Sequence, residues 1–280
     1  MLGRAQNKVD AGQSERLRQL AVDPSPAVRQ QILCRVNVLY LADPNLMWEL
    51  CETAFSSEKN PNVLTFLLSA VGNVMHARPD WVADNLKALF ISRRTSPENG
   101  RELGHAFVSL VMSLFLWEGN TTSGDLVFSW CDNPVENHAL VSGVIVTMRG
   151  ALVAGDPLSP TEREDNVRAR AQEILRRVVV SCLEIYDRII QLSDLDQETR
   201  GQAEVTVQLL DIITRELYHG SGAFAASNPL HANQAMIVSN PAKFARFLEE
   251  TLHSRPFGSM RSSITIDVGS STSHPRIRKI

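Results

Sequence analysis

The stretch Leu17-Arg18-Gln19-Leu20-Ala21-Val22-Asp23-Pro24-Ser25-Pro26-Ala27-Val28-Arg29 contains the signals that decide the fold. Ser25 suits a helix N-cap, because its hydroxyl oxygen can accept a hydrogen bond from a free N–H group of the first turn. Pro26 suits the first helical position, because it has no N–H group and its φ is already helical. Apolar residues then return at the spacing of one helix face, at Val28, Ile32, Val36 and Leu39. A helix beginning at Pro26 is therefore predicted.

The same signal repeats along the first half of the chain. Successive prolines lie 17 or 18 residues apart at Pro26, Pro44, Pro61, Pro79 and Pro97, and Pro134 follows 37 residues later. All but Pro79 follow a capping residue: Ser25, Asp43, Asn60, Ser96 and Asn133. The loop 119–125 offers caps where one proline is missing. Short helices that start at such intervals predict an all-α fold, an α-solenoid of antiparallel helix pairs.

The turn in the opening stretch resembles the inter-helix signature of HEAT repeats. The resemblance lies in the leucines, the Asp23-Pro24 turn and the Val28-Arg29 pair that begins the next helix, with echoes at Asn60-Pro61-Asn62-Val63 and Asp132-Asn133-Pro134-Val135. Neither echo keeps the arginine after valine. A tetratricopeptide repeat would have a similar period, but its Trp-x-x-Leu-Gly-x-x-Tyr helix is absent. The resemblance implies HEAT-like repeats over residues 1–155.

The period breaks after residue 155. Ser159 and Glu162 have the spacing of a capping box and predict a long helix to Leu192, followed by a second helix from Asp196 to His219. This hairpin, residues 156–220, would cap the solenoid. Residues 221–256 are expected to form a loop and a docking helix that starts at Asn240-Pro241, and residues 257–280 a disordered tail.

Composition excludes several classes of protein. The chain of 280 residues has 28 Lys and Arg against 31 Asp and Glu, so no global positive field attracts nucleic acid or anionic lipid. Its start is polar and no apolar stretch reaches a membrane-spanning length, so we expect no membrane association and a cytoplasmic location. Four cysteines without a CxxC pair argue against a zinc ribbon or disulfide scaffold: Cys34, Cys51, Cys131 and Cys182.

Motifs for catalysis are missing. The sequence has no GxxxxGK[ST], no GxSxG and no HExxH, so we expect no catalytic residues, no cofactor and no metal site. A HEAT-like enzyme that holds a metal or a pigment remains an alternative, because ligands from distant repeats are invisible in a sequence.

Two groups of residues could serve binding. Tryptophans recur near the repeat period at Trp48, Trp81 and Trp117, and they are either core positions or an interaction stripe. Basic residues collect near the N-terminus at Arg4, Lys8, Arg16, Arg18, Arg29 and Arg35, and again at Arg93, Arg94 and Arg101.

Stacked repeats expose a long continuous surface, so we expect a non-enzymatic scaffold that binds a protein partner on its concave face within a larger assembly. The alternative is a HEAT-like nucleic-acid-binding protein, in which Arg18, Arg29, Arg35, Arg93 and Arg94 line one stripe. A further resemblance links residues 209–222 to the helical arms of large bacterial signalling ATPases, and it implies an ATPase outside this chain. The oligomeric state and the partner's identity stay open.

Overall fold

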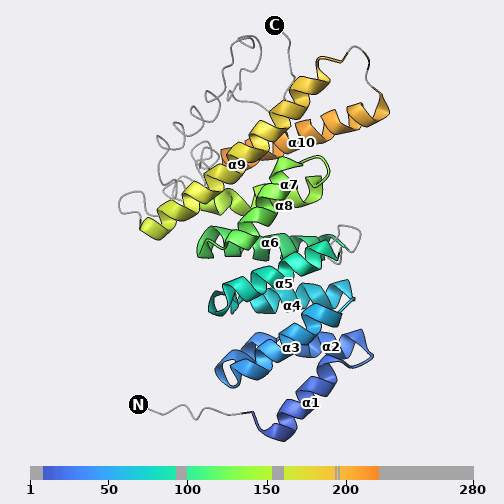
Figure 1. Ribbon diagram of the computed structural model, residues 1–280, viewed down its shortest axis with the longest axis vertical. Coiled ribbons are helices and arrows are strands. Elements are labelled where there is room, and N and C mark those ends of the chain that lie inside the picture. The colour runs from blue at the N-terminus through green and yellow to red at the C-terminus, as the bar shows by residue number, and fades with distance from the viewer. Residues whose placement is uncertain (1–8, 93–99, 153–160, 193, 195, 221–280) are drawn as a thin grey trace, which may run out of the picture. The chain divides into compact units, whose positions relative to one another are not determined.

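A computed structural model describes residues 9–92, 100–152, 161–192, 194 and 196–220. The chain divides into two units, Met1–Ser239 and Asn240–Ile280, and every described residue belongs to the first. The described part is helical and contains no strand, which confirms the all-α prediction. Its α-helices, labelled in Figure 1, are α1 (Ala11–Ala21), α2 (Pro26–Leu33), α3 (Pro44–Ser57), α4 (Pro61–Gly72), α5 (Pro79–Ile91), α6 (Arg101–Glu118), α7 (Thr121–Asp132), α8 (His138–Leu152), α9 (Glu162–Ile189) and α10 (Gln197–Gly220). Two 3-10 helices, η1 (Val36–Leu41) and η2 (Met75–Ala77), lie between them.

Proline begins four of these helices, as predicted. Pro26, Pro44, Pro61 and Pro79 are the first residues of α2, α3, α4 and α5. The side chain of Asp43 accepts a hydrogen bond from Leu46 N–H at 3.0 Å. That of Asn60 accepts from Asn62 and Val63 at 3.0 and 3.2 Å. Ser25, in contrast, makes no side-chain cap.

The later helix starts differ from the prediction. Helix α6 begins at Arg101, while Ser96 and Pro97 lie outside the described residues. Asn120 caps α7 by accepting from Ser123 N–H at 2.9 Å, so the predicted loop does supply a cap. The helix predicted to begin at Pro134 begins four residues later, at His138, so that prediction is wrong. Residues 133–137 form a turn instead, in which Asn137 N–H donates to Asn133 O at 3.2 Å.

The long helix α9 has a capping box two residues beyond the predicted one. Thr161 is the N-cap, and its side chain and that of Glu164 bond reciprocally to each other's backbone N–H groups. Ser159 lies outside the described residues. Helix α9 also ends at Ile189, before the predicted Leu192, while α10 closely matches the predicted second helix. The docking helix and the tail expected after residue 220 lie outside the described residues as well.

Alternate helices pack together in two rows (Figure 1). One row contains α2, α4, α6, α8 and α10, each in contact with the next. In the other row α1 contacts α3, α5 contacts α7, and α7 contacts α9, while α3 and α5 meet through the rings of Trp48 and Trp81 at a centroid distance of 5.0 Å. Most successive helices are also in contact, beginning with α1 and α2, α3 and α4, and α5 and α6, and both α9 and α10 pack on α8. We call these the even row and the odd row.

Apolar side chains between the rows form a continuous core. Fully buried examples come from successive helices: Leu33, Leu67, Leu86, Phe107, Val144 and Val178. Because α8 contacts both α9 and α10, this core continues past residue 155 without a break.

Polar contacts also join helical segments that are far apart in the sequence. Arg29 on α2 donates from Nε and Nη2 to the carboxylate of Glu58, after α3, at 2.6 and 2.9 Å. Asn120 donates to Asp80 at 2.7 Å, and Arg177 to Asp132 at 3.2 Å. Each of these contacts links residues at least 29 positions apart, so it holds one helical segment against another.

Candidate functional site

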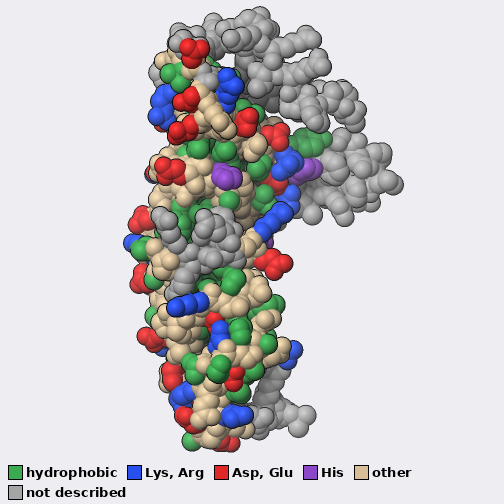
Figure 2. All heavy atoms as spheres, turned by 90° about the vertical axis from the view of Figure 1, so that its right-hand side faces the viewer, with side chains coloured by type: hydrophobic (Ala, Val, Ile, Leu, Met, Phe, Trp, Pro, Cys, Tyr) green, Lys and Arg blue, Asp and Glu red, His purple; other side chains and the backbone are tan. Residues whose placement is uncertain are grey.

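Three helices of the odd row differ in charge from two helices of the even row. Helices α3, α5 and α7 of the odd row carry one cationic side chain, Lys87, and six exposed acidic residues: Glu49, Glu52, Asp80, Asp84, Asp125 and Asp132. In the even row, α4 has no charged side chain, and α8 has one arginine and one histidine. Figure 2 shows acidic side chains gathered along one border of the view. Helices α4 and α8 therefore present a surface with few charges, whereas α6 carries Arg101, Glu102 and Glu118 near its ends.

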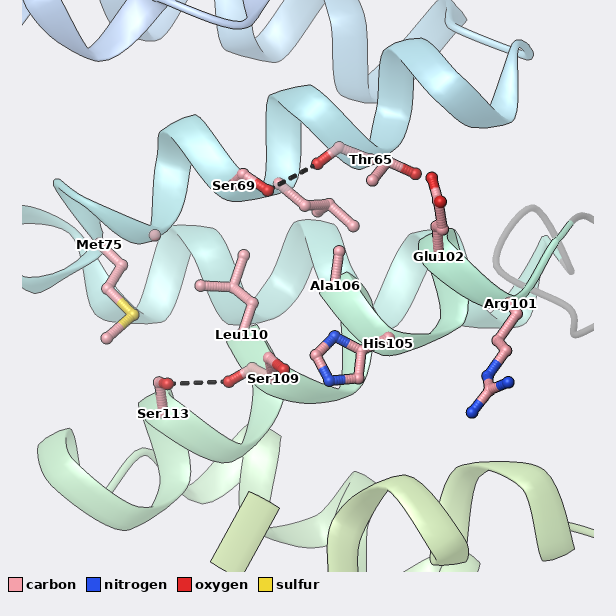
Figure 3. A pocket seen from close by; sticks show the side chains of 12 residues that line it. Thr65, Ser69, Met75, Arg101, Glu102, His105, Ala106, Ser109, Leu110 and Ser113 are labelled. Carbon is pink, nitrogen blue, oxygen red and sulfur yellow. Dashed lines mark hydrogen bonds between the residues drawn. The ribbon is translucent and has the colours of Figure 1, made fainter. Parts of the chain in front are cut away.

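A groove of about 740 Å³ lies on the even row between α4 and α6 (Figure 3). Its floor contains Leu68 and Leu110, which are 1% and 4% exposed. Small and polar side chains form the walls: Thr65, Ser69 and Gly72 on α4, and Ala106, Ser109 and Ser113 on α6. Met75, at the start of η2, closes one end. The volume falls in the range of sites that hold a small ligand or a few residues of a peptide.

Hydroxyl groups of these walls are bonded within their own helices. Thr65 donates to Pro61 O at 2.8 Å, and Ser69 to Thr65 O at 3.1 Å. On the facing helix Ser113 donates to Ser109 O at 2.8 Å. Helical serine and threonine commonly bond in this way to the carbonyl four residues earlier. Their oxygen lone pairs stay available.

Three charged or titratable side chains stand at the other end of the groove. Arg101, Glu102 and His105 belong to the first turns of α6 and are exposed. In Figure 3, Glu102 reaches toward Thr65, whereas Arg101 and His105 point away from α4. The residue before the helix, Gly100, has φ 115° and provides no side-chain cap. The first turn of α6 therefore lacks the cap that α4 and α7 possess.

Three of the four cysteines are unsuited to nucleophilic chemistry. Burial raises the pKa of the Cys51, Cys131 and Cys182 thiols to about 12 each, so they are protonated at neutral pH. Within the described residues no group of three or more His, Cys, Asp or Glu could hold a metal ion.

Two described members of the predicted arginine stripe, Arg18 and Arg29, are paired with carboxylates. Arg18 donates to Glu49 at 2.6 and 2.9 Å, a hydrogen bond that also holds the pKa of Glu49 below its ordinary value against the opposing effect of burial. Arg29 is tied to Glu58, and Arg35 is exposed. Arg93 and Arg94 lie outside the described residues. The guanidinium groups of Arg18 and Arg29 already donate to carboxylates, and a phosphate would need those same N–H groups.

The tryptophans also divide. Trp48 is 4% exposed and belongs to the core, where the half-buried Trp81 packs edge-on against it. Trp117 is 41% exposed, with the Arg163 guanidinium 5.9 Å above its ring. Trp130, at 1% exposure, packs between Phe90 and Phe107. Trp48, Trp81 and Trp117 therefore do not form one exposed stripe.

Sequence reasoning missed the groove residues. The signal was present in α6, where Arg101, His105, Ser109 and Ser113 recur every four residues and so share one face. Only the packing of α4 beside α6 shows that this face borders a groove.

Comparisons with known proteins add no family: no protein-family model matches the chain, and no curated protein or solved structure matches it significantly. Among the described helices, none has both the length and the apolar character that crossing a membrane requires.

Proposed function

We propose that this chain is a non-enzymatic, HEAT-like α-solenoid that binds a protein partner through its even row. The observation that carries the proposal is the grooved surface of α4 and α6, on which α4 has no charged side chain and α6 is charged only near its ends, beside the acidic helices α3, α5 and α7. Protein interfaces are depleted of charge at their centre, whereas ordinary exposed helix surfaces are rich in it. A surface whose middle is free of charge therefore suits a protein partner.

The packing supports the choice of row. Even helices contact one another along their whole series, while α3 and α5 in the odd row meet through large aromatic side chains. Closer packing in one row curves a stack toward that row, so the even row would form the concave face of the solenoid. Buried and unpaired thiols at Cys51, Cys131 and Cys182 suit a cytoplasmic protein in a larger assembly.

Nucleic-acid binding has weaker support. Arg29 on α2 is paired with Glu58. Arg149 on α8 is paired with Glu216, at 3.0 Å between Arg149 Nη1 and Glu216 Oε2. A phosphate backbone is bound by a series of free cations, and those pairs leave few of them on the even row.

Site-specific photo-crosslinking in native cells tests the proposal. Phe66 on α4 is 42% exposed, so benzoylphenylalanine can replace it without disturbing the core. The matched control places the same residue at Lys87, which is exposed on α5. We expect a discrete protein adduct from position 66 and none from position 87. Equal labelling from both positions, or adducts that disappear after nuclease treatment, would contradict the proposal.

A further inference from the structure

One side of the 3-10 helix η1 exposes apolar side chains to solvent. Leu41 and Val38 are 81% and 69% exposed. Side chains three residues apart in a 3-10 helix lie above one another on the same side, so these two form a pair. Val36, on a different side of η1, is buried and belongs to the core. Exposed apolar side chains that lie together mark contact surfaces more often than single ones do.

A cation lies on the same side of η1. Val38 N–H donates to Arg35 O at 3.0 Å, so the three-residue repeat of the 3-10 helix already includes Arg35. We call Arg35, Val38 and Leu41 the η1 stripe. Arg35 is exposed, and its guanidinium forms no hydrogen bond or ion pair with any described residue, whereas Arg18 and Arg29 are paired with carboxylates. The charge of Arg35 is therefore available to a partner.

No described carboxylate pairs with this cation. Arg35 is the one charged residue in the sequence between Arg29 and Asp43, and α4, which packs against η1, carries no charged side chain. Asp43 lies beyond the other end of η1, where it accepts a hydrogen bond from the backbone of α3 at 3.0 Å. On α3, Glu49 is paired with an arginine of α1, and Glu52 lies about one turn further along the exposed side of the same helix. The Arg35 end of the stripe therefore favours an acidic group from a partner.

The spacing of the stripe sets the spacing of the partner's side chains. A 3-10 helix rises about 2.0 Å per residue, so Val38 and Leu41 lie about 6 and 12 Å along η1 from Arg35. An extended segment advances about 3.3 Å per residue and presents every second side chain on one side, which gives steps of about 7 Å. An α-helix presents every fourth residue on one side, at steps of about 6 Å. Either backbone matches the stripe if it carries an acidic residue at one step and aliphatic residues at the next two.

We infer that the η1 stripe binds an acidic and aliphatic segment of a partner protein, with an Asp or Glu side chain at Arg35 and aliphatic side chains at Val38 and Leu41. The stripe does not line the α4–α6 groove, so this inference goes beyond the proposed function. A second copy of the chain fits less well, because its own stripe brings no carboxylate to Arg35.

Selection from a phage-displayed library of random peptides against the full chain tests the inference. Enriched peptides are expected to carry Asp or Glu and two aliphatic residues at successive steps of two, or at successive steps of four. Arg35→Glu should weaken binding of such a peptide by about fivefold or more, because an attraction becomes a repulsion. Exchanging the acidic residue of the peptide for Lys should restore binding to this variant. The matched control Lys87→Glu reverses a charge on α5 and should leave binding unchanged.

A second pair of variants tests the apolar part of the stripe. Leu41→Ser should weaken binding by about tenfold, since an apolar contact is lost. Its matched control is Ile91→Ser at the end of α5, where the side chain is 70% exposed, and this control should bind as wild type does. Arg35 and Leu41 are both exposed, so neither substitution should lower the thermal midpoint.

Several outcomes would overturn the inference: enriched peptides without this pattern, no enrichment at all, binding that is insensitive to Arg35→Glu, or equal losses in the variants and their controls. A dimer of the free chain that Leu41→Ser dissociates would also overturn it, because the stripe would then belong to a contact between copies. The Phe66 crosslink tests the even row separately, so either proposal can fail without the other.

Discussion

Removing Arg29 should destabilise the protein strongly, because it removes a cation that is paired with a buried carboxylate. The Glu58 side chain is only 2% exposed, and it accepts two hydrogen bonds from Arg29 and one from each of the backbone N–H groups of Lys59 and Asn60. Breaking a buried pair by removing one partner costs roughly 3 to 5 kcal/mol. Since both backbone bonds remain in Arg29→Ala, we expect the lower end, about 3 kcal/mol.

The expected loss can be measured by thermal and urea unfolding of the full chain. For a protein of this size 1 kcal/mol corresponds to about 2 to 4 °C, so Arg29→Ala should lower the midpoint by about 6 to 12 °C. Arg18→Ala is the matched control, because it removes a similar two-bonded pair in which the side chains are 42% and 48% exposed. The control should lose clearly less stability, since exposed pairs are screened by water.

A double-mutant cycle isolates the pair. Glu58→Gln keeps an acceptor for the backbone N–H groups but removes the charge. The double variant Arg29→Ala/Glu58→Gln should therefore be more stable than the sum of the single losses predicts, by about 1 kcal/mol or more. Additive losses within about 0.5 kcal/mol would refute the reasoning.

Lowering the pH should narrow the difference in unfolding free energy between wild type and Arg29→Ala. Burial acts to raise the pKa of Glu58, but the hydrogen bonds from Arg29 and from the backbone outweigh it and hold that pKa below its ordinary value. The stabilisation by the Arg29–Glu58 pair is therefore fully present above the pKa that the carboxyl has in the unfolded chain. It is lost as the pH falls through the lower pKa that the carboxyl has in the folded protein. Without Arg29, burial dominates and the carboxyl takes up a proton more readily, so unfolding free energies should converge from neutral pH toward about pH 4.

Three further changes test the packing by urea unfolding. Leu67→Ala should cost roughly 2 to 4 kcal/mol, because Leu67 is fully buried and a cavity would remain; a loss under about 1 kcal/mol would contradict its place in the core. Asn60→Ala should cost about 1 kcal/mol by removing the cap of α4, and an unchanged midpoint would argue against that cap. Gly124→Ala should cost roughly 1 to 3 kcal/mol, since its Cβ would lie 2.8 Å from the Phe115 ring, whereas Gly104→Ala meets nothing within 4 Å and should stabilise α6 by about 0.5 to 1 kcal/mol. Effects of the same sign at the two glycines would refute that comparison.

Local signals predicted several helix starts well. Asp43-Pro44 and Asn60-Pro61 combine a cap with a proline, and both act as expected because cap and helix are neighbours in the chain. The long helix illustrates the limit of such patterns. Ser159 and Thr161 are each followed three residues later by a glutamate, so two overlapping capping boxes fit the same stretch. The described helix uses the second of them.

Other features depended on packing between distant residues. Pro134 suits a turn as well as a first helical residue, and here α8 starts only after that turn. The pairing of Arg29 with Glu58 and the groove beside Arg101 both arise from which helices become neighbours. A periodic pattern predicts that helices stack, but the side chains that meet across the stack depend on helix rotation and spacing, which no local signal encodes.

The internal bonds of the groove hydroxyls limit the shape a ligand can take. Thr65, Ser69 and Ser113 each commit their proton to a carbonyl of their own helix, so toward a ligand their oxygens act as acceptors. A helical ligand has already used its backbone N–H groups internally and would cover these acceptors without bonding them. A segment in extended form still has N–H groups to donate. The groove therefore discriminates between two conformations of the same peptide, and stapling a bound peptide into a helix should weaken its binding even if every side chain is kept.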